Sequence, residues 1–361
     1  MTERTFIASV AKVVDNHGDL QGLIDIQQRI ASQGFEVAHL VIEPISSDWH
    51  KPLPAYHFRS GCAPIEALNQ AQTLLANGHH AVLISGEDHI RSGYSKALRQ
   101  SLMAVYGQDY PLTQAYTDLA KQFMSIHDMD TPTFKHYCEL LFDNHKRSYA
   151  EAVNFDGGEH QLPGEKWYAP VTELFRGVDC ANPLIDFSAS VLVCSEYLVD
   201  KLALNRDQCV EVAGIGMGVL DGDGPEYIQQ IAKYAHLTQA FEQGCTQAGV
   251  DFNHLFYQGL ALLESYTCYP VVPMGFLLAS GLVKTPDELP RFLQHYPVTI
   301  TGGMNLARAP WNNPALNGII VMVQRLQKSD GSIDDKKVGL VHANGGLGYR
   351  QGVVILRAVE D

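Results

Sequence analysis

SGCAPIEALNQAQ, residues 60–72, places Cys62 directly before a predicted helix. Apolar residues recur at helical spacing through this segment, Pro64 lies in the first turn, where proline is tolerated, and Gly78 ends the pattern. Free backbone N–H groups and the helix dipole lower the pKa of a thiol at a helix N-terminus. Cys62 is therefore either an activated nucleophile or a small buried residue, and this segment leaves both interpretations open.

A short apolar run, HAVLIS (80–85), follows the helix and is typical of a buried strand that closes on the polar residues GEDH (86–89). The same order recurs near the C-terminus. There, a helix within NNPALNGIIVMVQRLQKSDGS (312–332) precedes the strand VGLVHA (338–343), which closes on NGG. The recurrence predicts a duplicated α/β unit.

Residues 95–185 are helix-rich and aromatic, and we interpret them as an insertion between the two halves. The predicted boundaries are an N-terminal half over 1–94, the inserted helical domain over 95–185, and the remainder of the first half with the C-terminal half over 186–361. A further helix is predicted over 227–249. Other strands are predicted at TFIASVAKVV (5–14), FEVAHLVIE (35–43), SASVLVCS (188–195), VEVAGIGMG (210–218) and GVVILRAV (352–359).

The composition of the 361 residues, 46% apolar and 18% charged with a net charge of −14, is that of a globular protein. Its negative charge argues against nucleic acid or an anionic membrane surface as a partner. No apolar run reaches the roughly 18 residues of a membrane span, and no signal peptide is evident. The seven cysteines form no CxxC pair, which argues against a metal site and favours reduced thiols in a cytoplasmic protein.

Six segments, in the right order, resemble the thiolase superfamily, and within it the sterol-carrier-type thiolases and their thiolase-like relatives. The resemblance covers nearly the whole chain from Cys62 onward, whereas the first 60 residues fit the family's opening strand and helix poorly. The six segments are CAPIEALNQAQTLLANGHHAVLISGED (62–88), TDLAKQFMSIHDMDTPTFKHYCELLFDNHKRSYAEA (117–152), CANPLIDFSASVLVCSE (180–196), ALLESYTCYPVVP (261–273), TITGGMNLARAPWNN (299–313) and VGLVHANGGLGYRQGVVIL (338–356).

This resemblance implies a five-layered αβαβα fold built from two duplicated mixed-sheet halves with a helical loop-domain insertion. It also implies a homodimer, or a partner subunit that is an active thiolase or a small zinc-ribbon and OB-fold protein. The implied substrate is a thioester of coenzyme A or an acyl carrier, with no further cofactor. In the family, a cysteine thiolate takes up the acyl group while a histidine and a second Cys or His act as bases.

Several family positions are altered in this chain. Aligned from the helix body, the nucleophile position falls on Gly61, and on Cys62 only if one residue is missing from the first turn. Tyr266 stands where the family has a catalytic His or Asn. Ala309 occupies the position of a basic histidine, and a methyl group cannot abstract a proton, which argues against ordinary Claisen condensation.

The resemblance makes Cys62, His342 and Tyr266 the candidate catalytic residues. His342 occupies the position of the second reactive cysteine at the end of a predicted buried strand, although a structural histidine would also fit there. The candidate substrate-binding residues are Cys268, Gly302, Gly303, Asn312, Gly345 and Gly346.

Three functions follow as hypotheses. The first is an acyltransferase in which Cys62 is acylated, His342 acts as base and Tyr266 polarises a carbonyl. The second is a catalytically inactive subunit that binds acyl-CoA or supports an active partner. A weaker third is a thioester hydrolase that uses Cys62 and His342.

Overall fold

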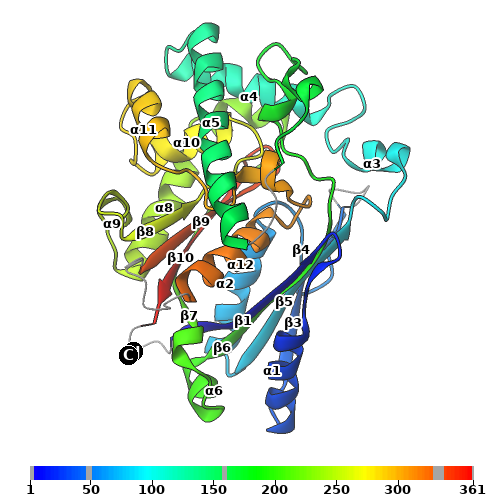
Figure 1. Ribbon diagram of the computed structural model, residues 1–361, viewed down its shortest axis with the longest axis vertical. Helices are drawn as coiled ribbons and strands as arrows, with labels where there is room; N and C mark the ends of the chain where they lie inside the picture. The colour runs from blue at the N-terminus through cyan, green and yellow to red at the C-terminus, as the bar shows by residue number, and fades with distance from the viewer. Residues whose placement is uncertain (1–3, 46–50, 157–160, 328–336, 360–361) are drawn as a thin grey trace.

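The computed structural model describes residues 4–45, 51–156, 161–327 and 337–359, which fold around a mixed ten-stranded sheet in two halves (Figure 1). The N-terminal half contains β1 (Thr5–Val14), β2 (His17–Asp19), β3 (Val37–Ile42), β4 (His57–Phe58), β5 (Ala81–His89) and β6 (Asp186–Ser195). The C-terminal half contains β7 (Val210–Val219), β8 (Ala261–Glu264), β9 (Val338–Gly345) and β10 (Arg350–Ala358).

The two halves repeat one topology, which confirms the predicted duplication. In the first half, β3 is parallel to β5, β5 is antiparallel to β6, and β6 is antiparallel to β1. In the second, β8, β9, β10 and β7 pair in the same sequence of directions. Helix α1 (Gln21–Ser32) follows β1 as α8 (Ala235–Ala248) follows β7. The first 60 residues, poorly matched in sequence, therefore supply the opening strand and helix of the fold.

The helices lie in three layers around the two half-sheets, so the predicted αβαβα order is confirmed. Helices α2 (Ala63–Ala76) and α12 (Pro314–Gln327) lie side by side between the halves and share one apolar cluster with strands of both (Figure 1). Helix α1 and α6 (Glu196–Lys201) cover the outer face of the first half. Helix α8 and α10 (Val271–Ala279) cover the outer face of the second.

A row of glycines brings α8 close to β7. A Cβ at Gly216 would lie 1.7 Å from the carbonyl oxygen of Ala240, and one at Gly218 would lie 1.9 Å from that of His236. The GIGMG segment is thus a helix-packing surface and does not form a dinucleotide loop. The helix predicted over 227–249 is broken, because Tyr234 adopts a left-handed conformation (φ 51°) between α7 (Ile228–Ile231) and α8.

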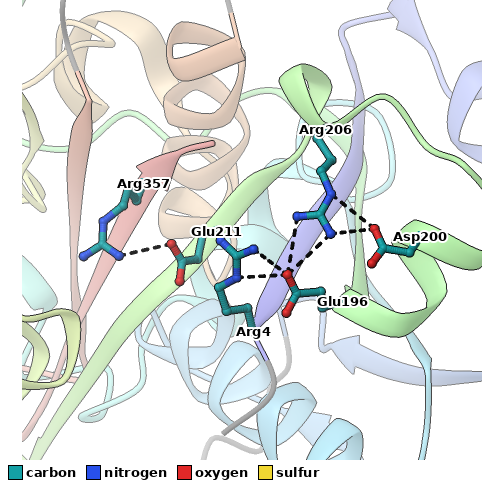
Figure 2. A network of polar contacts seen from close by, with 6 residues as sticks. All are labelled: Arg4, Glu196, Asp200, Arg206, Glu211 and Arg357. Atoms are coloured by element: carbon teal, nitrogen blue, oxygen red, sulfur yellow. Dashed lines mark hydrogen bonds and ion pairs between the residues drawn. The ribbon is translucent and has the colours of Figure 1, made fainter. Parts of the chain in front are cut away.

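The two half-sheets are joined by a short seam between β1 and β7, where Phe6 pairs with Glu211 and Ile7 with Val210. Figure 2 shows the charged side chains beside this seam. Glu196 accepts hydrogen bonds from Arg4 and Arg206. Arg357 on β10 donates a hydrogen bond of 3.1 Å to Glu211 on β7. The Glu196 pairs link the residue before β1 and the residues after α6 to the start of α6. The Arg357–Glu211 pair links β10 to β7.

The insertion between β5 and β6 lies at the top of the view in Figure 1. Its helices are α3 (Lys96–Leu102), α4 (Leu112–Ile126) and α5 (Thr131–Asp156), of which α4 packs against α7 and α10 of the C-terminal half. Two short helices, α9 (Phe252–Tyr257) and α11 (Leu289–His295), belong to the C-terminal half. The insertion matters for function because its α3–α4 connection closes a cavity over the start of α2.

Candidate active site

A cavity of about 600 Å³ lies at the N-terminal end of α2. Six segments line it: the residue before Cys62, the α3–α4 region of the insertion, the loop before β6, the loop after β8, the loop before α12, and the end of β9. None of the described lining side chains carries a charge. The lining residues used below are Gly61, Tyr106, Tyr116, Tyr266, Cys268, Ala309, Trp311, Asn312, Asn344 and Gly346.

Gly61, and not Cys62, faces this cavity. A Cβ placed on Gly61 would lie 2.1 Å from the hydroxyl of Tyr266 and 2.3 Å from the carbonyl oxygen of Asn344. At Gly61, where the resemblance places the nucleophile, the first side-chain atom would therefore collide with the Tyr266 phenol. The Tyr266 phenol occupies the space in front of the N-terminus of α2.

The Cys62 side chain points into the core instead. It is fully buried, belongs to the apolar cluster between the half-sheets, and its sulfur would lie 2.8 Å from a Cβ at Gly352 on β10. Burial raises the pKa of the Cys62 thiol well above its usual range, the Glu66 carboxylate adds to the rise, and Arg350 opposes it. The helix dipole does not overcome burial here, so the group is a protonated thiol at neutral pH.

Tyr266 presents an unengaged hydroxyl to the cavity. Its side chain is 7% exposed, and among the described residues its hydroxyl has no hydrogen-bond partner. Burial raises the pKa of Tyr266 well above its usual range, and nearby Cys268 and Cys62 add to the rise. The phenol is therefore protonated at neutral pH and can donate a hydrogen bond to a ligand oxygen.

His342 lies behind Tyr266 and has both ring nitrogens engaged. Its Nδ1 accepts from the backbone N–H of Tyr266 at 3.3 Å, so Nε2 carries the proton and donates to Oε1 of Gln351 at 2.8 Å. The ring stacks on Phe276, with centroids 4.6 Å apart. Burial lowers the pKa of His342 to about 4. His342 is thus a neutral ring that holds the Tyr266 backbone, and neither nitrogen is free to accept a proton.

This hydrogen-bond chain continues to the cavity wall. Gln351 donates to Asn344 Oδ1 at 2.8 Å, and Asn344 donates to the hydroxyl of Tyr116 at 3.3 Å. Tyr116 donates in turn to the carbonyl of Gly346 at 2.9 Å and stacks on Tyr269. Satisfied buried networks of this kind fix side-chain positions. Sequence reasoning missed these residues, although Gln351 inside an apolar strand was a usable signal.

The other candidate residues divide into two groups. Cys268, Asn312 and Gly346 line the cavity, whereas Gly302, Gly303 and Gly345 do not. Asn312 accepts from the backbone N–H of Ser60 and donates to the carbonyl of Glu43, so it clamps the chain just before α2.

Ala309, which the resemblance places at the position of a basic histidine, lines the cavity. Two further side chains on the cavity wall have perturbed pKa values. Burial raises the pKa of Cys268 to about 12, and burial raises the pKa of Tyr116 well above its usual range.

A second, outer cavity of about 940 Å³ adjoins the first and shares lining residues with it, among them Met103, Thr113 and Tyr269. Unlike the inner cavity, it is lined by basic side chains. These are Arg91, Lys96, Arg99 and Arg308. Arg91 and Arg308 pair with Asp15, at 2.9 Å and 3.4 Å, so in a chain with a net charge of −14 this cluster is a local concentration of partly paired positive charge.

No group of three or more His, Cys, Asp or Glu side chains in the described ranges is arranged to hold a metal ion. Within the same ranges, no helix is long and apolar enough to cross a membrane.

No protein-family model and no curated protein matches the sequence. Solved structures do match. A monomeric SCP2-thiolase-like protein type 1 from Mycobacterium smegmatis superimposes with a TM-score of 0.69 at 16% identity, over 99% of this chain and 78% of that chain. An Ltp2–ChsH2(DUF35) aldolase gives 0.67 at 18% identity, over 98% of both chains. An acetyl-CoA acetyltransferase from Syntrophomonas wolfei gives 0.64 at 12% identity, over 100% of both.

Proposed function

We propose that this chain, which has the thiolase fold, binds a coenzyme A-type thioester and cleaves a carbon–carbon bond in it by an aldol-type reaction. In this proposal, the Tyr266 hydroxyl polarises the thioester carbonyl, and no cysteine acyl-enzyme forms. The observation that carries it is the 2.1 Å separation between the Tyr266 hydroxyl and a Cβ at Gly61. A phenol stands where the superfamily's nucleophile would act.

The geometry does not favour the acyl-enzyme hypothesis. Cys62 is fully buried against β10 and lines neither cavity. His342, its expected base, has both nitrogens engaged by Tyr266 and Gln351. A thiol needs deprotonation and access to attack a thioester, and Cys62 has neither. The hydrolase hypothesis uses the same pair and meets the same obstacle.

The two cavities suit the two ends of a coenzyme A thioester. The basic outer cavity can take the phosphates, because Arg and Lys bind phosphate through charge-assisted hydrogen bonds. The uncharged inner cavity can take the acyl group, and its 600 Å³ is large enough for a bulky one. The thioester carbonyl would then lie near Tyr266, between the two.

An aldol-type cleavage fits the groups that line the inner cavity. Breaking the bond between the α and β carbons of a β-hydroxyacyl thioester leaves an enolate, which a hydrogen-bond donor at the carbonyl oxygen stabilises. A protonated Tyr266 supplies that donor, and the reaction needs no covalent nucleophile. One structural neighbour is itself described as an aldolase, which supports this reaction class over acyl transfer.

Substituting Tyr266→Phe tests the proposal. The wild-type chain, incubated with a panel of 3-hydroxyacyl-CoA thioesters, is expected to release an aldehyde or ketone and a shortened acyl-CoA, both measured by mass spectrometry. Losing the donor should lower kcat by about 10²–10³-fold, while substrate affinity changes little. Tyr257→Phe, which removes the hydroxyl of a tyrosine on α9 that lines neither cavity, is the matched control. Equal rates for wild type and Tyr266→Phe would refute the role of Tyr266.

We also propose a partner subunit for this chain. The Ltp2 aldolase is described together with a DUF35 protein, and it covers 98% of this chain. Exposed apolar side chains, Leu162, Trp167 and Val171, rim the outer cavity on the insertion and offer a surface for such a partner. Light scattering of the isolated chain distinguishes a monomer awaiting a partner from a homodimer.

A further inference from the structure

We infer that Tyr106, backed by Asp223, removes the hydroxyl proton of the substrate. This inference rests on the proposed cleavage, which needs a base at the β-hydroxyl as well as a donor at the carbonyl. Among the described side chains that line the inner cavity there is no carboxylate, histidine, lysine or arginine. A base must therefore act through a lining residue that is hydrogen-bonded to one.

Tyr106 is such a residue. It lies in the α3–α4 connection of the insertion and lines the cavity. Its hydroxyl donates a hydrogen bond of 2.8 Å to Oδ2 of Asp223. The other carboxylate oxygen, Oδ1, accepts the backbone N–H of Leu347 at 2.9 Å. Gly346, the preceding residue, also lines the cavity, and a Cβ there would lie 2.2 Å from Asp223 Oδ2. The carboxylate is thus fixed just behind the cavity wall.

The pair can take a proton without moving far. As the β-hydroxyl proton passes to the Tyr106 oxygen, the Tyr106 proton passes to Asp223. The bond between the α and β carbons then breaks, a carbonyl compound forms, and the electron pair enters the thioester enolate held by Tyr266. Return of the proton from Asp223 through Tyr106 to the α carbon regenerates the enzyme. Atoms and electrons balance with no additional reactant.

The remaining protic groups of the cavity lack a base. Tyr116 donates to the carbonyl of Gly346, which cannot take a proton. Cys268 lies beside Tyr116, and no carboxylate contributes to its environment. The groups that act electrostatically on Tyr106 are Asp223 and Tyr349, and Tyr349 carries no negative charge at neutral pH because burial raises its pKa.

The test uses Tyr106→Phe and Asp223→Asn in the full chain. Both should lower kcat for 3-hydroxyacyl-CoA cleavage by about 10²–10⁴-fold. Asp223→Asn keeps an oxygen for the Leu347 N–H, so the turn is retained. Asp223→Glu, which keeps the carboxylate, should restore part of the rate. Tyr110→Phe is the matched control, because Tyr110 makes an equal 2.8 Å bond to Asp118 but does not line the cavity.

A binding measurement separates this inference from the proposed reaction. Wild type should bind 3-hydroxyacyl-CoA about tenfold more tightly than the acyl-CoA without the hydroxyl, as one hydrogen bond of 1–1.5 kcal/mol implies. Tyr106→Phe should lose this preference. If wild type shows the preference but no cleavage, the proposed reaction is refuted and the contact stands. If Tyr106→Phe retains both the preference and the wild-type rate, Tyr106 is not the base.

Discussion

At the scale of single residues, Gly61 decides what the site can do. The absence of a side chain there leaves room for the Tyr266 phenol in front of α2. One position later, Cys62 turns into the core between the half-sheets. The sequence left open whether Gly61 or Cys62 takes the nucleophile position. In the structure the two neighbouring residues point to different sides, Gly61 to the cavity and Cys62 to the core.

We predict that Gly61→Ala destabilises the protein by about 1–3 kcal/mol, the usual cost of overpacking. The new methyl group would meet the Asn344 backbone oxygen at 2.3 Å, and that carbonyl cannot move without disturbing the end of β9. Urea unfolding measures the change. Gly22→Ala, on α1 with no atom within 4 Å of the added Cβ, is the control and should be neutral or slightly stabilising.

The His342 site shows why its role escaped sequence reasoning. A histidine at the end of a buried strand beside glycines fits a base and a structural residue equally well. Only the partners of its two nitrogens, the Tyr266 backbone and Gln351, distinguish the two roles. Those partners are 76 and 9 residues away along the chain, and the fold is what brings them to the ring.

At the scale of elements, α5 buries a histidine on the face that packs against the rest of the protein. His145 on α5 is 3% exposed, and neither ring nitrogen has a hydrogen-bond partner among the described residues, although Asn305 lies beside it. Burial lowers the pKa of His145 to about 3. In the unfolded chain the group titrates near pH 6.5.

This shift predicts an acid-sensitive fold. Between pH 6.5 and 3 the unfolded chain binds a proton on His145 that the folded chain does not, so stability is lost as the pH falls through this window. His145→Leu should remove that contribution. We expect the free energy of unfolding to drop less between pH 7.5 and 4.5 in this variant than in wild type, by an amount on the order of 2 kcal/mol. Equal drops would contradict the assignment.

The elements themselves were largely predictable. Strands such as β1 and β9 are short segments rich in apolar residues, and α2 and α12 have apolar residues at helical spacing. The helix predicted over 227–249 was wrong at one point, because Tyr234 takes a left-handed conformation that packing against Gly275 on α10 holds in place. Tertiary contacts of this kind override local propensity.

At the scale of the whole molecule, the two halves share one duplicated architecture. The order of strands and helices is the same in both halves, and solved thiolase-fold structures match it over the full length of the chain. The cavity wall was not predictable, because it joins six separate segments, two of them from the insertion. Tyr106 and Tyr116 reach the site only because α3 and α4 lie over it.

The most direct test of the account compares the effects of substituting Cys62 and Tyr266 on acyl-enzyme formation and on cleavage. Wild type, Cys62→Ala and Tyr266→Phe would be incubated with acyl-CoA and 3-hydroxyacyl-CoA. Intact-protein mass spectrometry would detect any acyl adduct, and the rate of cleavage would be measured on the same samples. We predict no acyl adduct on any of the three, cleavage retained in Cys62→Ala, and cleavage lost in Tyr266→Phe. An acyl adduct on wild type that disappears in Cys62→Ala, together with loss of turnover in that variant, would contradict the account.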